Sequence, residues 1–572
     1  MPQMDSARAK AKPLGSLDLA ALMLVPLLLR AATSHGNLLT LYQVKTQDLA
    51  ILLALPPLLF VLQRWAPAWR LPDRAPRTRM ILAAGVVVVV LLGWGAYALL
   101  YDFPISRDEH MVVFDMHVYD KARLAAPLPP RWRLYAEALV PDFLLNSVQP
   151  IGLVSDYLPV NALLRLAFSK VADPVFFNPV LALIGGLALL DIARRLFGDD
   201  TRALWVALIV YLLSSQMLVN TMTTYAMTGH MALNLVWLAA FLRGGRGGHA
   251  TAIGVGFLAV GLHQLVFHLL FALPFILWRL RQGAWRLSLL YAVAYGAIAA
   301  WWIVFPLLSA MQAGASVGQQ SGGSRFFDKV MPLLLKRDPL TVSWMMLNLL
   351  RFVAWQHLAV LPLVLAAIPV ARRGGLATPM LGGIALGLIF VTVVLPYQGH
   401  GWGYRYLHPY LGSFALLAGL GYQQLALKAP TRTDGMFIVL SVLTLFGAMP
   451  TLMWQARAFT RPQAALDRFI AAKKSDFVVI DTEVPTPTTD GRWAISAIDE
   501  VRNDPDLLNR PLRFSSQAMD GAMIAELCRR GTVSVVGWPD MHRLGYGPNI
   551  IDKGRRFPAM TAILRERGCL MR

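Results

Sequence analysis

The sequence predicts a polytopic α-helical membrane protein that carries a small α/β domain at its C-terminal end. Of the 572 residues, 56% are hydrophobic and only 15% are charged, and the mean hydropathy is +0.51. Soluble proteins have roughly 25% charged residues, so most of this apolar surface has to face lipid rather than fill a water-soluble core. These values exclude a soluble enzyme, a disordered chain and a coiled coil.

Apolar runs of about 15–23 residues, the length of a membrane helix, recur up to residue 454 and predict about 11–13 transmembrane helices. The runs 251–263 and 265–278 are too short to span comfortably, and we expect a helical hairpin broken at residues 261–264 there. The expected helices are 16–33, 48–63, 81–100, 175–193, 203–219, 228–242, 251–263, 265–278, 287–309, 350–371, 378–396, 411–428 and 436–454.

The basic residues predict the orientation. The net charge of +20 does not indicate nucleic acid, because the basic residues lie in loops between apolar runs, where they meet lipid headgroups. They occur in alternate loops, which by the positive-inside rule places the N-terminus in the cytoplasm and the C-terminus outside. The clusters are Arg8/Lys10/Lys12, Arg64/Arg70/Arg74/Arg77/Arg79, Arg194/Arg195/Arg202, Arg243/Arg246, Arg279/Arg281/Arg286, Arg372/Arg373 and Lys428/Arg432.

We expect three parts: an N-terminal membrane hairpin with a cytoplasmic basic loop (1–80), a membrane module (81–454) and an extracytoplasmic α/β domain (455–572). The long loops 101–174, 310–349 and 396–411 share the outer side with that domain. In the domain, 477–480 and 533–536 are typical of buried strands, and 462–473 and 518–530 of helices. Its two cysteines, Cys528 and Cys569, can form one disulfide, although their spacing alone does not decide this.

The densest polar cluster follows the third helix, at residues 106–121. If this stretch is helical, Asp108, Asp115 and Tyr119 share one face, and His110 lies on the other. We expect partial desolvation to raise the pKa of such a carboxylate and suit it to act as a base. Solvated charges on an interfacial helix are the alternative. His110 also leaves open a divalent metal beside Asp108, although the helical interpretation places the two residues on different faces.

A second polar stretch, 396–409, lies in another outer loop. Arg405 has the planar fork that suits phosphate oxygens, and His400 adds a donor. Trp402 and Tyr404 provide faces on which a sugar can stack, or else belong to an aromatic belt at the membrane surface. The loop 310–349 adds two cations that can help to hold a phosphate, and the broken hairpin adds a histidine that can face a polar cavity. These residues are Arg325, Lys329 and His263.

The Asp108–Glu109 pair, just after a membrane helix in the first large outer loop, resembles the GT-C superfamily of glycosyltransferases that use polyprenyl-phosphate sugars. The protein-mannosyltransferase and aminoarabinose-transferase branch is the most similar. Residues 155–160 resemble the family's loop-to-helix return, and the Gly403-Tyr404-Arg405-Tyr406 element resembles those near its lipid-phosphate site. The N-terminal hairpin and the C-terminal domain are departures from it. The resemblance implies that Asp108 is the base, with Asp115 and then Glu109 in reserve.

The resulting hypothesis is an inverting glycosyltransferase of a bacterial inner membrane. It would move a sugar from a polyprenyl-phosphate donor to an envelope glycan, lipid or protein, without a certain cofactor. A transporter or flippase for lipid-linked sugars and a non-catalytic envelope assembly protein are the alternatives. A transporter needs polar residues deep in its helices, and acidic residues are almost absent from the apolar runs.

Overall fold

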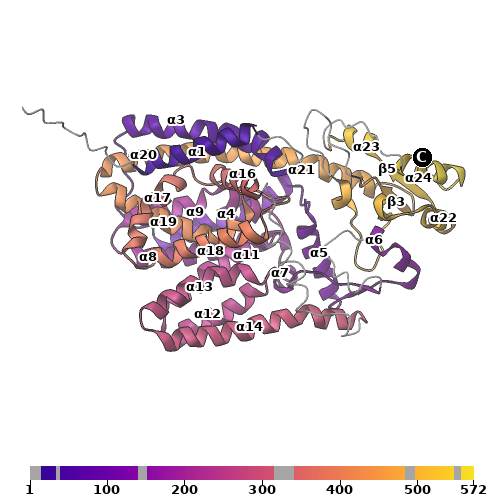
Figure 1. Ribbon diagram of the computed structural model, residues 1–572, viewed down its shortest axis with the longest axis horizontal. Coiled ribbons are helices and arrows are strands. Elements are labelled where there is room, and N and C mark those ends of the chain that lie inside the picture. Colours follow the sequence, from indigo (N-terminus) through magenta and orange to yellow (C-terminus); the bar gives the residue numbers. More distant parts are fainter. Residues whose placement is uncertain are drawn as a thin grey trace, which may run out of the picture.

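The computed structural model describes residues 15–33, 39–139, 151–314, 341–483, 496–546 and 556–571. It consists of a bundle of apolar helices, the membrane module, and a C-terminal domain at one end of it (Figure 1). A helix that is 42 residues long, Pro430–Ala471, leaves the bundle and enters the domain. It combines α20 (Pro430–Leu443), a π-helical turn (Thr444–Ala448) and α21 (Met449–Ala471).

Among the described residues, six helices are long and apolar enough to cross a membrane, or seven if α9 and α10, bent by 47°, form one span. This is fewer than the 11–13 spans expected, because several expected segments fold as helices of 12–17 residues inside the bundle. The other helices of the bundle are α1 (Ser16–Thr33), α2 (Leu39–Gln43), α3 (Leu49–Trp65), α4 (Thr78–Ala98), α8 (Phe177–Phe197), α9 (Thr201–Leu212), α10 (Ser215–Thr221), α11 (Met227–Arg243), α12 (Gly245–Val260), α13 (Val266–Arg281), α14 (Trp285–Gln312), α16 (Thr341–Ala354), α17 (Val360–Arg372), α18 (Ala377–Val394) and α19 (Leu411–Ala426).

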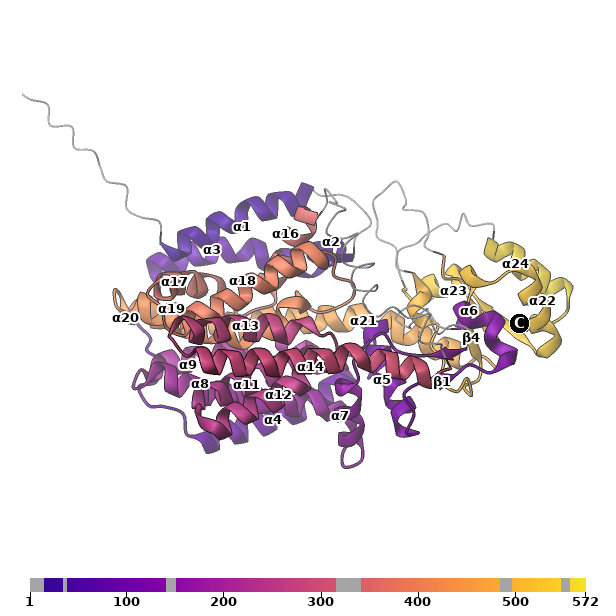
Figure 2. The same cartoon turned by 60° about the horizontal axis from the view of Figure 1, so that its bottom comes forward.

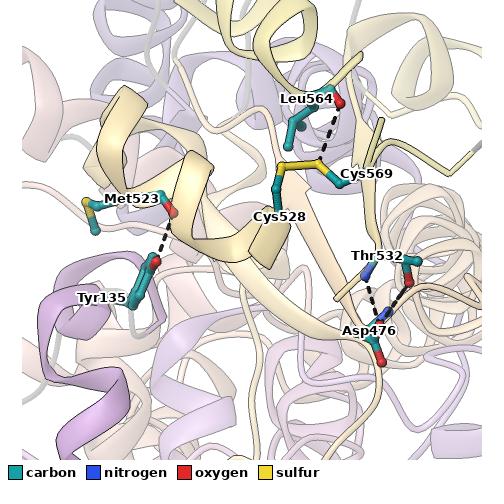
Figure 3. The surroundings of a disulfide bond; sticks show 7 residues. All are labelled: Tyr135, Asp476, Met523, Cys528, Thr532, Leu564 and Cys569. Atoms are coloured by element: carbon teal, nitrogen blue, oxygen red, sulfur yellow. Dashed lines mark hydrogen bonds between the residues drawn. A yellow bond between two sulfur atoms is a disulfide. The ribbon is translucent and has the colours of Figure 1, made fainter. Parts of the chain in front are cut away.

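The C-terminal domain is built on a three-stranded parallel sheet in the order β4-β3-β5, in line with the expected α/β domain. The strands are β3 (Phe477–Ile480), β4 (Leu512–Ser515) and β5 (Val533–Val536), and the helices are α22 (Gly521–Arg530), α23 (Trp538–Arg543) and α24 (Arg556–Glu566). β3 and β5 are short, nearly continuous apolar runs, as expected for strands of a parallel sheet that is buried on both faces, whereas β4 alternates apolar and polar residues. A disulfide joins Cys528 of α22 to Cys569, beyond α24 (Figure 3).

Part of the loop 101–174 completes the core of this domain. Trp132 and Tyr135 lie in a 3-10 turn (Pro130–Tyr135) that precedes α6 (Ala136–Leu139). Their rings pack 5.5–6.0 Å from Phe477 and Phe514 of the sheet. The Tyr135 hydroxyl donates to the carbonyl of Met523, also drawn in Figure 3. The domain is therefore attached to the membrane module through this loop as well as through α21.

The same loop also contains α5 (Arg107–Asp120), α7 (Val160–Ser169) and a two-stranded antiparallel ribbon of β1 (Ala126–Pro127) and β2 (Gly152–Leu153). Both views place α5 between the membrane helices and the C-terminal domain (Figures 1 and 2). The polar stretch predicted from the sequence is therefore helical and lies where the two parts of the molecule meet.

Candidate functional site

Asp108 lies in the first turn of α5. Ser106 caps this helix by accepting the backbone N–H of Glu109, the side-chain-to-backbone bond that fixes a helix start. One carboxylate oxygen of Asp108 accepts a hydrogen bond from the Tyr157 hydroxyl at 2.5 Å, and the other accepts one from Arg405 Nη1. Asp108 and Arg405 are each 7% exposed. Asp108 and Arg405, one from each of the two polar stretches found in the sequence, therefore form a buried ion pair.

The break between α12 and α13 positions Tyr157. The backbone N–H groups of Leu158 and Val160 donate to the carbonyls of His263 and Gly261 in this break. The His263 ring stacks on the Tyr157 ring at 4.0 Å. The break expected at residues 261–264 is thus confirmed, and it holds the loop that carries Tyr157 against Asp108.

The conformation of its own loop positions Arg405. Gln398 accepts the Arg405 backbone N–H at 2.8 Å and donates to the carbonyl of Gly403 at 2.9 Å. Tyr225 and Tyr406 lie under the guanidinium, with ring centroids 5.2 and 5.4 Å away. Cation–π contacts of this kind stabilise a desolvated guanidinium.

The pKa of Asp108 is shifted in the opposite direction to the one expected. Burial raises the pKa of its carboxyl, but Arg405, His263 and the Tyr157 hydroxyl outweigh burial and hold that pKa below its ordinary value. The expectation of a raised pKa is therefore wrong for this residue, because it counted desolvation without the cation. Asp108 is a carboxylate anion at neutral pH.

The two reserve acids are differently placed. Glu109 accepts the backbone N–H groups of Ile105 and Thr224 at 3.0 and 3.2 Å, so it ties the start of α5 to the bundle. Burial raises the pKa of its carboxyl to about 7. Burial also raises the pKa of Asp115 to about 8, although a hydrogen bond with Ser155 opposes this. Asp115 is therefore largely protonated at neutral pH and cannot accept a proton until it ionises.

The two faces of α5 are as predicted. Asp108 and Asp115 are buried and Tyr119 is half-buried, whereas His117 is exposed. His110, seven residues before His117 on the same face, is half-buried. Burial lowers its pKa to about 3, and the nearby charges of Arg502 and Arg513, which belong to the C-terminal domain, add to this effect. His110 is therefore neutral and lies on the domain side of the helix, away from the ion pair.

Two aromatic residues of the loop 396–409, for which a sugar-stacking role was expected, are buried instead of facing a cavity. Trp402 and Tyr404 are 1% and 0% exposed. Asn220 of α10 donates to the carbonyl of Trp402, and Gln216 donates to that of Tyr404. These two rings pack against the bundle, and the sugar-stacking role expected for them has no exposed ring face in this structure.

The loop needs a glycine at one point. Gly403 has φ +66°, a conformation that favours glycine. A Cβ at this position would lie 2.4 Å from Gln216 Oε1. The backbone of the loop thus comes close to α10, which carries two of its anchors.

Asp499 of the C-terminal domain contacts both segments that form the site. This residue was not identified from the sequence. It lies in a 3-10 turn (Ala497–Glu500). One of its carboxylate oxygens is 2.8 Å from Arg107 Nε, and the other is 3.4 Å from His400 Nε2. Arg107 precedes Asp108 and His400 belongs to the Arg405 loop, so a single carboxylate contacts both segments. No sequence signal marks this residue, since its role depends on how the domain docks.

Arg325 and Lys329 lie outside the described residues. Within the described ranges, no group of three or more His, Cys, Asp or Glu residues is arranged to hold a metal ion. The described part of the site therefore consists of the Asp108–Arg405 ion pair and the aromatic, amide and hydroxyl groups that contact these two residues.

No protein-family model matches the chain, and no curated protein matches it. In structure the chain is similar to ArnT from Cupriavidus metallidurans. The apo form gives a TM-score of 0.46 at 14% identity over 73% of this chain and 86% of ArnT. The form bound to undecaprenyl phosphate gives 0.47 at 12% identity over 86% and 89%. The chain is also similar to arabinofuranosyltransferase AftD from Mycobacteria, with a TM-score of 0.43 at 15% identity over 81% of this chain but 34% of AftD. At these values the activity of the chain has to be inferred from its own residues.

Proposed function

We propose that the protein is an integral membrane glycosyltransferase that moves a sugar from a polyprenyl-phosphate donor to an extracytoplasmic acceptor. The observation that carries this proposal is the buried Asp108–Arg405 pair. It brings a candidate base and a candidate phosphate ligand together, at the end of an apolar bundle that faces a folded domain. The resemblance of the loops around both residues to GT-C enzymes points to the same chemistry.

In the proposed reaction, the donor phosphate would replace Asp108 as the partner of Arg405. A guanidinium binds a phosphate through two parallel hydrogen bonds, as it does a carboxylate. When the phosphate takes the place of Asp108 on Arg405, the carboxylate loses its strongest partner and its affinity for a proton rises. Donor binding would thus turn a stabilised anion into an effective base.

Asp108 would then take the proton from the nucleophilic hydroxyl or amine of the acceptor. The acceptor atom attacks the anomeric carbon, the carbon–oxygen bond to the lipid phosphate breaks, and the configuration inverts. Arg405 holds the charge that develops on the departing phosphate, which is the largest contribution expected of a fixed cation. The proton on Asp108 leaves to water after the product has departed.

Three features support the proposed location and arrangement. Alternating basic loops predict that the loops of the site lie outside a bacterial inner membrane. The disulfide in the C-terminal domain fits an oxidising compartment. The apolar bundle fits a donor with a long hydrocarbon chain, and the C-terminal domain, next to α5, would receive the envelope acceptor.

Replacement of the base tests the proposal. Asp108→Asn keeps the shape of the side chain but removes its capacity to accept a proton. In reconstituted protein supplied with a panel of radiolabelled polyprenyl-phosphate sugars, we expect the variant to bind a donor and to lose turnover by about 10²–10⁴-fold. Asp120→Asn is the matched control, because Asp120 lies on the same helix, is exposed and pairs with Lys170. Its turnover should match that of the wild type.

The same assay separates the alternatives. A flippase would move labelled lipid across the bilayer equally in the wild type and in Asp108→Asn, with no release of polyprenyl phosphate. An assembly protein would do neither. Either result would overturn the transferase proposal.

A further inference from the structure

A second polar site lies at the opposite end of the molecule. There a cavity of about 910 Å³ opens between the start of α12, the end of α13 and the start of α14. α14 begins here and runs for 28 residues to Gln312, whose side chain accepts the backbone N–H of Leu124 beside the ribbon of the outer loop. At 1.5 Å per residue, about 42 Å separates this cavity from the loop side. Figure 2 shows α14 crossing the bundle in this way.

Three arginines line the cavity: Arg246, Arg279 and Arg286. In the described ranges, none of them forms an ion pair with a carboxylate, and Arg279 donates instead to the side-chain oxygen of Gln282 at 2.9 Å. The sequence accounts for this, since it contains no Asp or Glu between Asp200 and Asp328. The positive charge of the cavity is therefore not neutralised by this segment.

The backbone adds to the positive potential. α12 begins at Gly245 and α14 at Trp285, and both residues line the cavity. The first turn of a helix presents unpaired N–H groups and the positive end of the helix dipole. Gly283, with φ +83°, turns the chain between α13 and α14 at the wall of the cavity. Two helix starts and three guanidinium groups thus surround the same space.

The rim of the cavity is apolar on the lipid side. Trp285 is 56% exposed and Leu290 is 49% exposed, and both line the cavity. Arg286 lies over the Trp285 ring at 5.4 Å. Tryptophan and arginine in this arrangement are typical of the level of the lipid headgroups. A ligand that presents an anionic head to the arginines and an apolar tail to Trp285 and Leu290 would satisfy both surfaces.

We propose that this cavity binds the phosphate of an anionic phospholipid, in the leaflet remote from the C-terminal domain. On the positive-inside expectation this is the cytoplasmic leaflet. The bound lipid would hold the ends of α12 and α14 together. This site is independent of the proposed transfer reaction, which uses the other end of the bundle.

Native mass spectrometry of the protein released from nanodiscs of mixed phosphatidylglycerol and phosphatidylcholine tests the proposal. We expect the wild type to retain phosphatidylglycerol in preference. In Arg246→Gln/Arg279→Gln/Arg286→Gln, retention should fall by about fivefold for each charge removed. Arg372→Gln/Arg373→Gln/Arg432→Gln removes as many charges from exposed positions at the same end and should retain the lipid.

Equal retention in the cavity variant, or an equal loss in the control variant, would overturn the proposal. Displacement of phosphatidylglycerol by inorganic phosphate at millimolar concentration would replace the lipid by a soluble phosphate as the ligand and would also overturn it. If the triple variant does not fold, Arg246→Gln alone serves, because Arg246 is exposed. It should still lower retention about fivefold.

Discussion

Asp108 divides its two carboxylate oxygens between the Tyr157 hydroxyl and the Arg405 guanidinium, and this division sets its protonation state. Asp115, seven residues along the same helix face, is buried and has a hydrogen bond with Ser155, and burial raises its pKa to about 8. Two carboxyl groups on one face of α5 thus have opposite pKa shifts. The neighbours of each group cause the difference.

Tyr157→Phe tests the first half of this contrast. The hydroxyl stabilises the charged form of Asp108, so its loss should raise the pKa of that carboxyl and move the acidic limb of the pH–rate profile to higher pH. The measurement is the pH dependence of kcat/KM. Tyr211→Phe, which removes a buried hydroxyl that donates to Ala182, should leave the profile unchanged. An unshifted limb in Tyr157→Phe would contradict the assignment.

Asp115 should make stability depend on pH. Its folded-state pKa of about 8 lies above the ordinary value of 3.8. The stability that this group contributes is therefore fully present below about pH 4 and is lost as the pH rises to about 8. Asp115→Asn carries no charge at any pH, so its Tm in detergent should fall less than that of the wild type between pH 5 and pH 9, by several degrees. Identical pH dependence in both proteins would show that Asp115 is ionised in the folded state.

At the scale of elements, the N-terminal hairpin is joined to the loop of the site through α16. Asp48 lies inside the apolar helix Leu39–Trp65, at the end of a π-helical turn (Val44–Asp48). Asp48 and Arg351 of α16 are both 0% exposed and form an ion pair at 3.2 Å. Arg351 also donates to the carbonyl of Gly401 at 3.3 Å. Asp48 is thus a buried acidic residue within a candidate membrane helix, and through Arg351 it supports the Arg405 loop.

Removing only the cation of this pair should be costly. Arg351→Met leaves the Asp48 carboxylate buried without its partner, and we expect a loss of about 3–5 kcal/mol in unfolding by SDS. The double variant Asp48→Leu/Arg351→Met removes both charges and should recover most of this loss. The exposed pair Arg195–Asp191 is the comparison, since Arg195→Met should cost about 0–1 kcal/mol. A similar cost for both single variants would rule out a special role for the buried pair.

At the scale of the whole molecule, the C-terminal domain and the membrane module form one site. Trp132 and Tyr135 of the loop 101–174 pack in the core of the domain, and Asp499 of the domain contacts the segments that carry Asp108 and Arg405. This exchange suggests a role for the domain beyond acceptor binding. We infer that the domain fixes the position of the segment that carries Asp108 relative to the loop that carries Arg405.

Asp499→Asn tests this role. The variant weakens the contacts with Arg107 and His400 without changing the size of the side chain, and we expect kcat to fall by about 10–100-fold while donor binding remains, because small misplacements of reacting groups are costly. Asp540→Asn removes an exposed pair with Arg543 in the same domain and should have wild-type kcat. An unchanged kcat in Asp499→Asn would mean that the domain does not position the site.

The disulfide should stabilise the domain. Cys528 and Cys569 are separated by 41 positions in the sequence. Closing a loop of this length is worth about 3–4 kcal/mol through the entropy of the unfolded chain. Cys528→Ser/Cys569→Ser should therefore lower the unfolding midpoint of the domain, followed by proteolysis of the detergent-solubilised protein. Reduction of the wild type by dithiothreitol should reproduce the effect, and an unchanged midpoint would contradict it.

The sequence by itself determined the membrane class, the α/β character of the C-terminal domain, the helix at 106–121 and the break near His263. It also singled out Asp108 and Arg405. Apolar runs, helical spacing and clusters of charge are local properties, so they can be read along the chain. Only the tertiary structure decided that Asp108 and Arg405 are each other's partner, that Trp402 and Tyr404 are buried, and that Asp499 bridges the loops. Asp108 and Arg405 are 297 positions apart, and contacts between such distant residues depend on how the helices pack, which no local pattern encodes.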